Sequence, residues 1–500
     1  MSQSQDELFS GRLESDPSSS REPTAREVNR QIRAENRRKK EKLAISTRSR
    51  GELVPYIKEA YSAKREHDPH AQLNFLLSRS GYISGTGRYR GVAQKTRTDF
   101  GDTLHRAIKE LKKIRMPILK IGDFRRVHVI ALIKYWIEQG QEASTLQTKS
   151  SVLRKFLSAI NKPEAMPIGR VWTSILAEQG IDVKKLRRSK VAKTAKAWSA
   201  KGIDAYGLIE KIAEQHPVVA IEMLVQLAFG MRVKESMMVD PATADEGNRI
   251  KLVDGVKNGL ERHVNFDPDP EIAAFQRAAL EHAKRIAAQH PKLILAIPKR
   301  TLLQMRNHYY YVLRKYGITK KGLGIVSHGL RHQYINRHHK SISGLPAPVL
   351  RAAPVQLYSI HADKVREAER DTSRQVGHKR PDVTGPYNST VAHMSKEAKQ
   401  ELDAHLELFQ ESAGVAAAFQ HACVQTAWFV GRLAYGMPIK PGMTIEMQVL
   451  VPAHLVTPNT EAGLRARIEA SVGRQVSISI STDPMKRPED GYELIMAADR

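Results

Sequence analysis

Two imidazoles and a guanidinium lie close together in the segment SHGLRHQYINR, which covers residues 327–337. A helix over this segment would bring His328, Arg331 and His332 to neighbouring positions, because residues three and four apart share a helix face. Core packing does not require such a group, whereas a guanidinium beside imidazoles can bind an anion and exchange a proton next to it. The segment therefore predicts an anion-binding site with acid–base capacity.

The charge of the whole chain indicates which kind of anion binds at this site. Its 500 residues include 80 Lys and Arg against 53 Asp and Glu, which gives a formal net charge of +27. A field of this size collects polyanions, among which nucleic acid is the most common. A basic protein without such a partner is the alternative that charge alone leaves open. We expect double-stranded DNA as the partner.

Two further segments place charged side chains where they could serve a phosphate. GMRVKE puts Arg232 directly after an apolar helix, with Glu235 one helical turn later and well placed to orient the guanidinium. VDGVKNGLERHVNF predicts two short strands around the strong turn signal Asn258-Gly259, with Lys257 at the bend. Each feature alone has an ordinary structural explanation, such as an ion pair between Arg232 and Glu235.

A third segment, QVGHKRPDVTGPY, supplies His378 and, nine residues later, Tyr387. Singly, His378 could cap a helix and Tyr387 could be a core aromatic. A Tyr hydroxyl has a reference pKa of about 10, so it attacks well near neutral pH only beside a base and a positive field. The combination of all these segments is therefore more informative than any one of them.

In this order the boxes GMRVKE, VKNGLER, HGLRH, VGH and TGPY resemble those of the tyrosine recombinases, the integrases of phages and other mobile elements. The spacing agrees as well, since Lys257 lies five residues before the Arg of ERHV, and Tyr387 nine residues after the His of VGH. The resemblance covers residues 85–410. Two departures concern local packing: Val376 stands where the family has Leu, and the 46 residues between the Arg of HGLRH and the His of VGH exceed the spacing of compact members.

The resemblance implies a site-specific DNA recombinase that breaks and rejoins strands through a 3′-phosphotyrosyl intermediate, encoded by a bacterial mobile element. The catalytic residues that it implies are Arg232, Lys257, His328, Arg331, His378 and the nucleophile Tyr387, with Glu235 in support. Two alternatives stay open: DNA relaxation of the type IB topoisomerase kind, and a non-catalytic DNA-binding accessory factor on the same scaffold.

No cluster of residues has the spacing of metal ligands, and we expect neither a metal nor a cofactor. The nearest pair, His338 and His339, is adjacent in the sequence, and we expect both to be surface residues of a basic helix.

The elements that position these residues are expected to form an α+β fold that is mainly α. Apolar side chains at helical spacing, beginning with Phe100, Leu104 and Ile108, predict a helical bundle over residues 85–162. The resemblance makes this bundle a SAM-like domain that binds the DNA core site. Residues 201–410 would then form the tyrosine-recombinase catalytic domain, which includes a small β-sheet.

Residues 411–500 differ in character, with eight Lys and Arg against nine Asp and Glu. Strand-like runs on either side of a helical segment predict a small α/β module there. A preceding apolar stripe of Leu402, Leu406 and Phe409 is expected to dock on a neighbouring protomer of a homo-tetramer on DNA. The module itself could contact an accessory protein, and an inert domain packed on its own catalytic core is the alternative.

Two segments that contain basic runs are expected to contact DNA. Residues 1–45 predict a disordered, basic N-terminal arm, for which a solvated charged face is the alternative. Residues 163–200 predict a basic linker, for which a flexible tether is the alternative. The basic residues expected at the DNA lie in this linker and at the entrance to the helical bundle: Lys184, Lys185, Arg187, Arg188, Lys190, Lys193, Lys196, Arg88, Arg90, Lys95 and Arg97.

The single cysteine, Cys423, excludes an internal disulfide framework and suits a reducing compartment. The N-terminus lacks the apolar core of a signal peptide, and no stretch approaches the roughly 20 apolar residues of a membrane span. We therefore expect a cytoplasmic, nucleoid-associated bacterial protein with no membrane partner.

Overall fold

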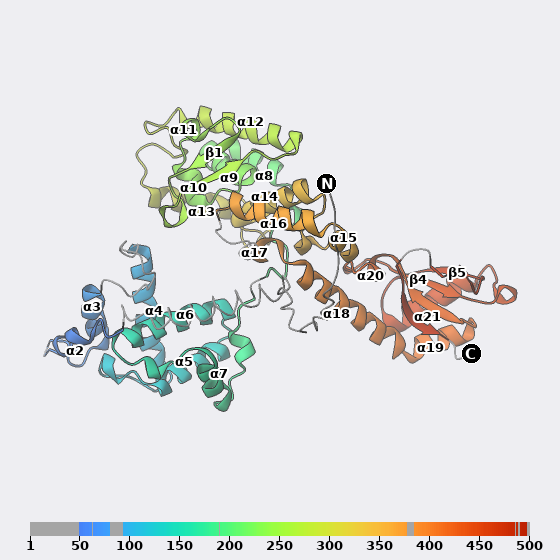
Figure 1. The fold of residues 1–500 in the computed structure, drawn as a ribbon, viewed down its shortest axis with the longest axis horizontal. Helices are drawn as coiled ribbons and strands as arrows, with labels where there is room; N and C mark the ends of the chain where they lie inside the picture. The colour runs from blue at the N-terminus through green and yellow to red at the C-terminus, as the bar shows by residue number, and fades with distance from the viewer. Residues whose placement is uncertain are drawn as a thin grey trace, which may run out of the picture. The chain divides into compact units, whose positions relative to one another are not determined.

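The computed structural model describes residues 50–62, 64–80, 94–189, 191–377, 385–485, 487–488 and 491–497. The chain divides into two compact units, Met1–Arg188 and Ser189–Arg500 (Figure 1). In the described residues helices dominate, and the strands form one two-stranded and one four-stranded sheet, which confirms the expected mainly α class. None of the described helices combines the length and apolar character needed to cross a membrane. The expected N-terminal arm over residues 1–45 lies outside the described residues.

The first unit is a bundle of helices around one apolar core. Along α4, Phe100, Leu104, Ile108 and Leu111 recur every three or four residues and are all buried, so this face drives the packing of the helix. The elements of the unit are α2 (Val54–Ala60), α3 (Pro69–Arg79), α4 (Gln94–Lys113), η1 (Ile121–Asp123), α5 (Arg126–Glu138), α6 (Ala143–Ala159), η2 (Pro163–Ala165), α7 (Gly169–Glu178) and η3 (Val183–Leu186).

Part of the basic segment 163–200, which the sequence assigns to a linker, is packed into the two units. Trp172 and Leu176 of α7 are buried in the core of the first unit. At the other end, Trp198 is buried in the core of the second unit, and the division between the units falls after Arg188. The positive charge of this segment is confined mainly to residues 184–196, whereas the stretch around Trp172 and Leu176 has Arg170 as its basic residue and an apolar helical face.

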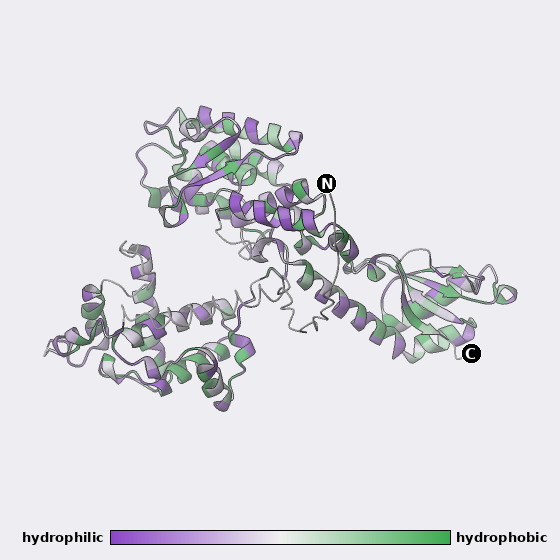
Figure 2. Cartoon of the chain, viewed as in Figure 1, coloured by the Kyte–Doolittle hydropathy of each residue, from purple (hydrophilic) through white to green (hydrophobic). Residues whose placement is uncertain are grey.

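The second unit is built around α9 (Pro217–Phe229), whose residues from Val219 onward are all buried. A helix that is apolar on every side belongs at the centre of a domain, where other helices can cover it. The other helices up to residue 410 are η4 (Ser199–Lys201), α8 (Ala205–Ala213), α10 (Val233–Met238), α11 (Pro241–Ala244), α12 (Pro270–Ala287), α13 (Leu302–Lys315), α14 (His328–Ser343), η6 (Pro348–Leu350), α15 (Val355–Ile360), α16 (Ala362–Gln375), α17 (Gly385–Asn388) and α18 (Val391–Gln410), of which α8, α10, α12 and α14 pack on α9. Among these, α16 is coloured almost wholly hydrophilic (Figure 2).

The two-stranded sheet lies in this unit. β1 (Arg249–Leu252) pairs antiparallel with β2 (Arg262–Asn265), in register from Arg249 opposite Asn265 to Leu252 opposite Arg262. The strands are those expected, but the connection is longer than a two-residue turn and contains the short helix η5 (Lys257–Gly259). Asn258 and Gly259 therefore lie within a longer loop and do not form a two-residue hairpin turn.

The C-terminal module contains the four-stranded sheet, in the order β5-β4-β3-β6. β4 and β5 are parallel and are connected through α21, as strand-like runs on either side of a helix predict. The elements are α19 (Ala413–His421), β3 (Thr426–Phe429), α20 (Gly431–Ala434), β4 (Ile445–Leu450), η8 (Ala453–Leu455), α21 (Thr460–Val472), β5 (Val476–Ser481) and β6 (Glu493–Ala497).

The apolar stripe of α18 packs on this module in the same chain. Leu402 and Leu406 pack against the core of the module, and Phe409 is 1% exposed within it. The rings of Phe409 and Phe429 meet edge to face, with centroids 5.0 Å apart. The stripe therefore packs within its own chain here, and docking on a second copy of the chain stays a prediction.

Phe409→Ala should destabilise the C-terminal module by about 3–5 kcal/mol, because it removes a buried ring and leaves a cavity. The neighbouring Leu408 is 41% exposed, so Leu408→Ala should change stability by less than about 0.5 kcal/mol. Calorimetric unfolding of the full chain measures both effects. Equal effects of the two substitutions would contradict the packing described here.

Candidate active site

Residues from several elements of the second unit meet where α9 ends. Gly230 ends α9 in the left-handed conformation (φ 58°), and a Cβ there would lie 2.3 Å from the Tyr334 ring of α14. Only glycine allows both the backbone reversal and this close approach of α14. The turn brings Arg232, at the start of α10, toward Arg331 on α14.

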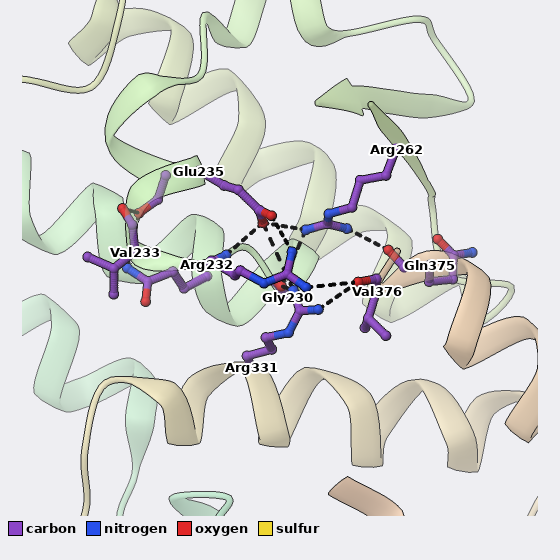
Figure 3. Close-up of polar contacts among 10 residues, drawn as sticks. Gly230, Arg232, Val233, Glu235, Arg262, Arg331, Gln375 and Val376 are labelled. Carbon is purple, nitrogen blue, oxygen red and sulfur yellow. Dashed lines mark hydrogen bonds and ion pairs between the residues drawn. The ribbon is translucent and has the colours of Figure 1, made fainter. Parts of the chain in front are cut away.

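Three arginines converge on the buried carboxylate of Glu235 (Figure 3). Oε1 of Glu235 accepts a hydrogen bond from Nη1 of Arg232 at 2.5 Å, and Oε2 accepts one from Nη2 of Arg262 at 2.7 Å. Nη1 of Arg331 lies 4.0 Å from Oε2. The backbone N–H of Arg232 also donates to Oε2, at 2.8 Å. The carboxylate therefore orients Arg232, as expected, and holds two further guanidinium groups near it.

Glu235 is ionised at neutral pH, because its pKa is lowered. Burial alone would raise the pKa of its carboxyl, but the charges and hydrogen bonds of Arg262 and Arg232 outweigh burial and lower the pKa to about 2. One carboxylate cannot neutralise three guanidinium groups, so the cluster keeps an excess of positive charge.

Backbone carbonyls accept further hydrogen bonds from the three arginines. Val376 O accepts from Nη2 of Arg331 at 2.7 Å and from Nη2 of Arg232 at 3.4 Å. Gln375 O accepts from Nη1 of Arg262 at 2.5 Å, and Gly230 O accepts from Nη1 of Arg331. The C-terminal end of α16 thus supplies an acceptor to each of the three arginines. Its partial negative charge favours cations at this place.

Two imidazoles and a phenol complete the site. The Tyr387 ring centroid lies 4.6 Å from that of His332, 5.8 Å from that of His328 and 6.0 Å from the guanidinium carbon of Arg331. His332 is the closest of these groups to Tyr387; the sequence placed it in the anion-binding group with His328 and Arg331 but not among the catalytic residues that the resemblance implies. Its place as the second His of HGLRH, one turn after His328, was the available signal.

Both imidazoles are neutral at physiological pH. Burial lowers the pKa of His332 to about 3, with contributions from His328, Lys196 and Arg331. Partial burial lowers the pKa of His328 to about 4, with smaller contributions from the charges of Arg331 and Arg232. Part of this residue is nevertheless exposed to solvent. An anion bound among the arginines would favour the protonated imidazoles and raise both pKa values.

The short helix α17, which carries Tyr387, is held from two sides. Gly385 O accepts a hydrogen bond from the backbone N–H of Ala192 at 2.8 Å. Asn336 on α14 donates through Nδ2 to the Asn388 side chain at 2.9 Å and to Tyr387 O at 3.5 Å. The phenol is thereby kept beside the histidines of the same chain.

Two lysines, Lys257 and Lys196, differ in how they lie relative to the histidines. Lys257, on η5, has an exposed side chain, and no described hydrogen bond or ion pair joins it to the arginines or to Tyr387. Lys196 lies closer, because its carbonyl would be 2.6 Å from a Cβ at Gly329, and its charge contributes to lowering the pKa values of His328 and His332. Lys196 was expected only as a contact to the DNA backbone.

His378 lies outside the described residues, as do Lys190, Arg88 and Arg90. The other expected DNA contacts have exposed side chains: Lys184, Lys185, Arg187, Arg188, Lys193, Lys196, Lys95 and Arg97. Within the described part of the chain, no group of three or more His, Cys, Asp or Glu could hold a metal ion.

The expectation that His338 and His339 are surface residues is wrong. Their side chains are 1% and 0% exposed, respectively. The polar sequence of α14 hid this burial, because most of its apolar contacts come from only a few residues, among them Leu330, Tyr334 and Ile335.

Neither a protein-family model nor a curated protein matches this chain. Among solved structures, it is similar to a lambda integrase dimer bound to a COC′ core site, at 17% identity and a TM-score of 0.39, over 63% of this chain and 76% of that one. It is similar to the Tn1549 transposon integrase with transposon right-end DNA, at 12% identity and a TM-score of 0.38, over 63% and 96%. It is also similar to the XerH site-specific recombinase bound to a palindromic difH substrate, at 12% identity and a TM-score of 0.38, over 69% of this chain and 88% of that one.

Glu235→Gln should lower the free energy of unfolding at pH 7 by about 3 kcal/mol, because a pKa lowered from 4.5 to about 2 corresponds to roughly that energy. The contribution of Glu235 is complete above its unfolded pKa and is lost as the pH falls through about 2. The variant should therefore lose less stability than the parent between pH 4.5 and pH 2.

Urea unfolding at several pH values measures this difference. The matched control is Glu246→Gln, which breaks an ion pair of the same i,i+3 spacing with Arg249 near the surface. It should change the stability far less than Glu235→Gln, because water screens an exposed ion pair. A Glu235→Gln variant as stable as this control would contradict the role assigned to the buried carboxylate.

Proposed function

We propose that the chain is a tyrosine-type site-specific DNA recombinase, with Tyr387 as the nucleophile. One observation carries the proposal: a phenol lies against two neutral imidazoles and the guanidinium of Arg331, at the edge of a cluster with excess positive charge. Such a combination suits attack on a phosphodiester, whose anionic oxygens need positive partners and whose transition state gathers further negative charge. The five sequence boxes that resemble the family support the same reaction.

Two buried polar atoms without a partner in the described part of the chain are evidence that a ligand binds beside Tyr387. Nε of Arg331 and Nδ1 of His332 are buried and have no hydrogen-bond partner among the described residues. Buried polar groups are usually paired, so groups left unpaired beside a positive cluster suit atoms that a bound anion engages. Arg232 is the most accessible of the arginines, with 25% of its side chain exposed, and would meet the phosphate first.

The reaction would proceed by direct displacement at phosphorus. The Tyr387 oxygen forms a bond to phosphorus while the bond to the 5′ oxygen of the DNA breaks, and the phenolic proton passes to His332 or His328. The imidazoles become better bases once the phosphate charge lies beside them. Arg232 and Arg331 bind the non-bridging oxygens, and Glu235 keeps their forks in place. His378 would add a hydrogen bond to the phosphate.

The departing 5′ oxygen takes up a proton, and a lysine is the donor that the family pattern implies. The product is a 3′-phosphotyrosyl link with a free 5′ hydroxyl, which preserves the energy of the broken bond. A second DNA end can therefore reseal the strand by the reverse steps without ATP.

The wider biological role is also part of the proposal. The net charge of +27 and the exposed lysines and arginines of residues 184–196 support binding to double-stranded DNA. We place the protein in a bacterial cytoplasm as the integrase of a mobile element, acting as a homo-tetramer on DNA. The C-terminal module, which covers its own α18, keeps its outer surface for an accessory protein.

Tyr387→Phe should bind DNA as tightly as the parent but form no covalent protein–DNA adduct, because only the attacking oxygen is lost. Nicked duplexes that carry the ends of the element, analysed on denaturing gels, reveal the adduct. Tyr334→Phe is the matched control, since Tyr334 lies on α14 near the site but is fully buried. It should still form the adduct. If Tyr387→Phe still formed the adduct, Tyr387 would not be the nucleophile. If the parent protein formed no adduct, a non-catalytic DNA-binding factor would be favoured.

The proton donor can be identified with a substrate whose 5′ oxygen is replaced by sulfur, because a thiolate leaves without being protonated. A variant that lacks the donor should cleave the ordinary substrate roughly 100-fold more slowly or worse and the sulfur substrate at the rate of the parent. We expect this rescue for Lys257→Ala. If Lys196→Ala is rescued and Lys257→Ala is not, the donor is the lysine that already lies beside the histidines.

A further inference from the structure

A buried histidine links three elements of the active site away from the reacting groups. His338, on α14, is 1% exposed. Its Nδ1 lies 2.8 Å from Oδ2 of Asp267, which follows β2, and its Nε2 lies 2.8 Å from Oδ2 of Asp371 on α16. The proposed mechanism uses none of these three residues.

The geometry itself specifies the protonation state. A neutral imidazole has one N–H and one lone pair, so one of its nitrogens would turn a lone pair toward a carboxylate oxygen. Two carboxylates at hydrogen-bond distance are both satisfied only by an imidazolium, which donates from each nitrogen. The bridge is therefore complete only when His338 is charged.

The surroundings favour this charge. Burial alone would lower the pKa of His338, but the hydrogen bonds and charges of Asp267 and Asp371 outweigh burial and raise it. The ring of Tyr334 stacks on the imidazole with an interplanar angle of 4°. The other charged or titratable groups that face the bridge are Arg337 and His339 on α14, Arg374 on α16 and Arg262 on β2.

The bridge is connected to the arginine cluster through one side chain. Gln375 donates through Nε2 to Oδ2 of Asp371 at 3.3 Å and accepts from the backbone N–H of Asn265 at 2.8 Å. The carbonyl of the same Gln375 accepts from Arg262, and the next carbonyl, of Val376, accepts from Arg331 and Arg232. The position of Asp371 therefore sets the position of the carbonyls that hold the three guanidinium groups.

We infer that His338 is a positioning residue of the active site, whose imidazolium ties α14 and β2 to the end of α16 and thereby keeps the arginines aligned for a phosphate. The inference rests on the proposed function. Loss of the proton leaves one carboxylate facing a lone pair, so the end of α16 loosens and cleavage slows.

The sign of the pH dependence follows from the raised pKa. A group whose pKa is higher in the folded state stabilises that state fully below its unfolded value of 6.5, and this contribution disappears as the pH rises through the folded value. The bridge should therefore weaken on the alkaline side, above pH 6.5.

The test compares single-turnover adduct formation by the full chain between pH 6 and pH 9. Asp371→Asn keeps a hydrogen bond, because the amide can donate to a neutral imidazole, and it removes the need for the charge. The ratio of its rate to that of the parent should rise at least fivefold across this range. His338→Gln should be slowest relative to the parent at pH 6 and approach it at pH 9. His339→Gln, an equally buried neighbour, should follow the parent throughout.

A second readout needs no DNA. Hydrogen exchange at the amides of Val376 and Gly377, which donate to Thr372 O and Arg374 O, reports opening at the end of α16. Corrected for intrinsic rates, this opening should increase above pH 6.5 in the parent but not in Asp371→Asn. The inference would be overturned if the parent formed adducts while the rate of each variant relative to the parent did not change with pH and hydrogen exchange at Val376 and Gly377 did not increase above pH 6.5. A parent that shows the exchange response but forms no adduct at any pH would overturn the proposed function and leave the positioning of α16 supported.

Discussion

The cluster of three arginines depends on one buried carboxylate. Three guanidinium groups gathered at the end of α9 would repel one another strongly in a medium of low dielectric constant, and burial of even one is costly without partners. Glu235 removes part of that cost by binding two of them directly. The carbonyls at the end of α16 and at Gly230 accept from further donors of the same groups. The positive charge that remains is fixed in direction, which is the requirement for stabilising a charge that develops during a reaction.

The sequence predicted the helical class, the buried faces and the order of the chemical boxes, because each depends on local spacing. Phe100, Leu104 and Ile108 reveal a buried face by their separation alone, and Arg232 and Glu235 are only one turn apart. The role of Arg262 could not be predicted in the same way. It is buried because β2 lies beside the end of α16, a contact between residues more than a hundred positions apart. His338 was assigned to the surface for the same reason, since its two carboxylate partners are distant in the sequence.

The C-terminal module shows a different limit of sequence reasoning. An apolar stripe along α18 was correctly recognised, but a stripe states only that something covers it. The residues that do so, including Phe429 of β3, come from a segment whose short strand was hidden in an apolar run. Because α18 continues from the segment that carries Tyr387 into the core of the module, the module is an integral part of the second unit.

The hydrogen bond between Ala192 and Gly385 gives the connector between the units a mechanical role. The chain that leaves the helical bundle passes the helix of Tyr387 before Trp198 anchors it in the second core. A displacement of Ala192 is therefore passed to the four-residue helix that carries Tyr387 through a backbone hydrogen bond.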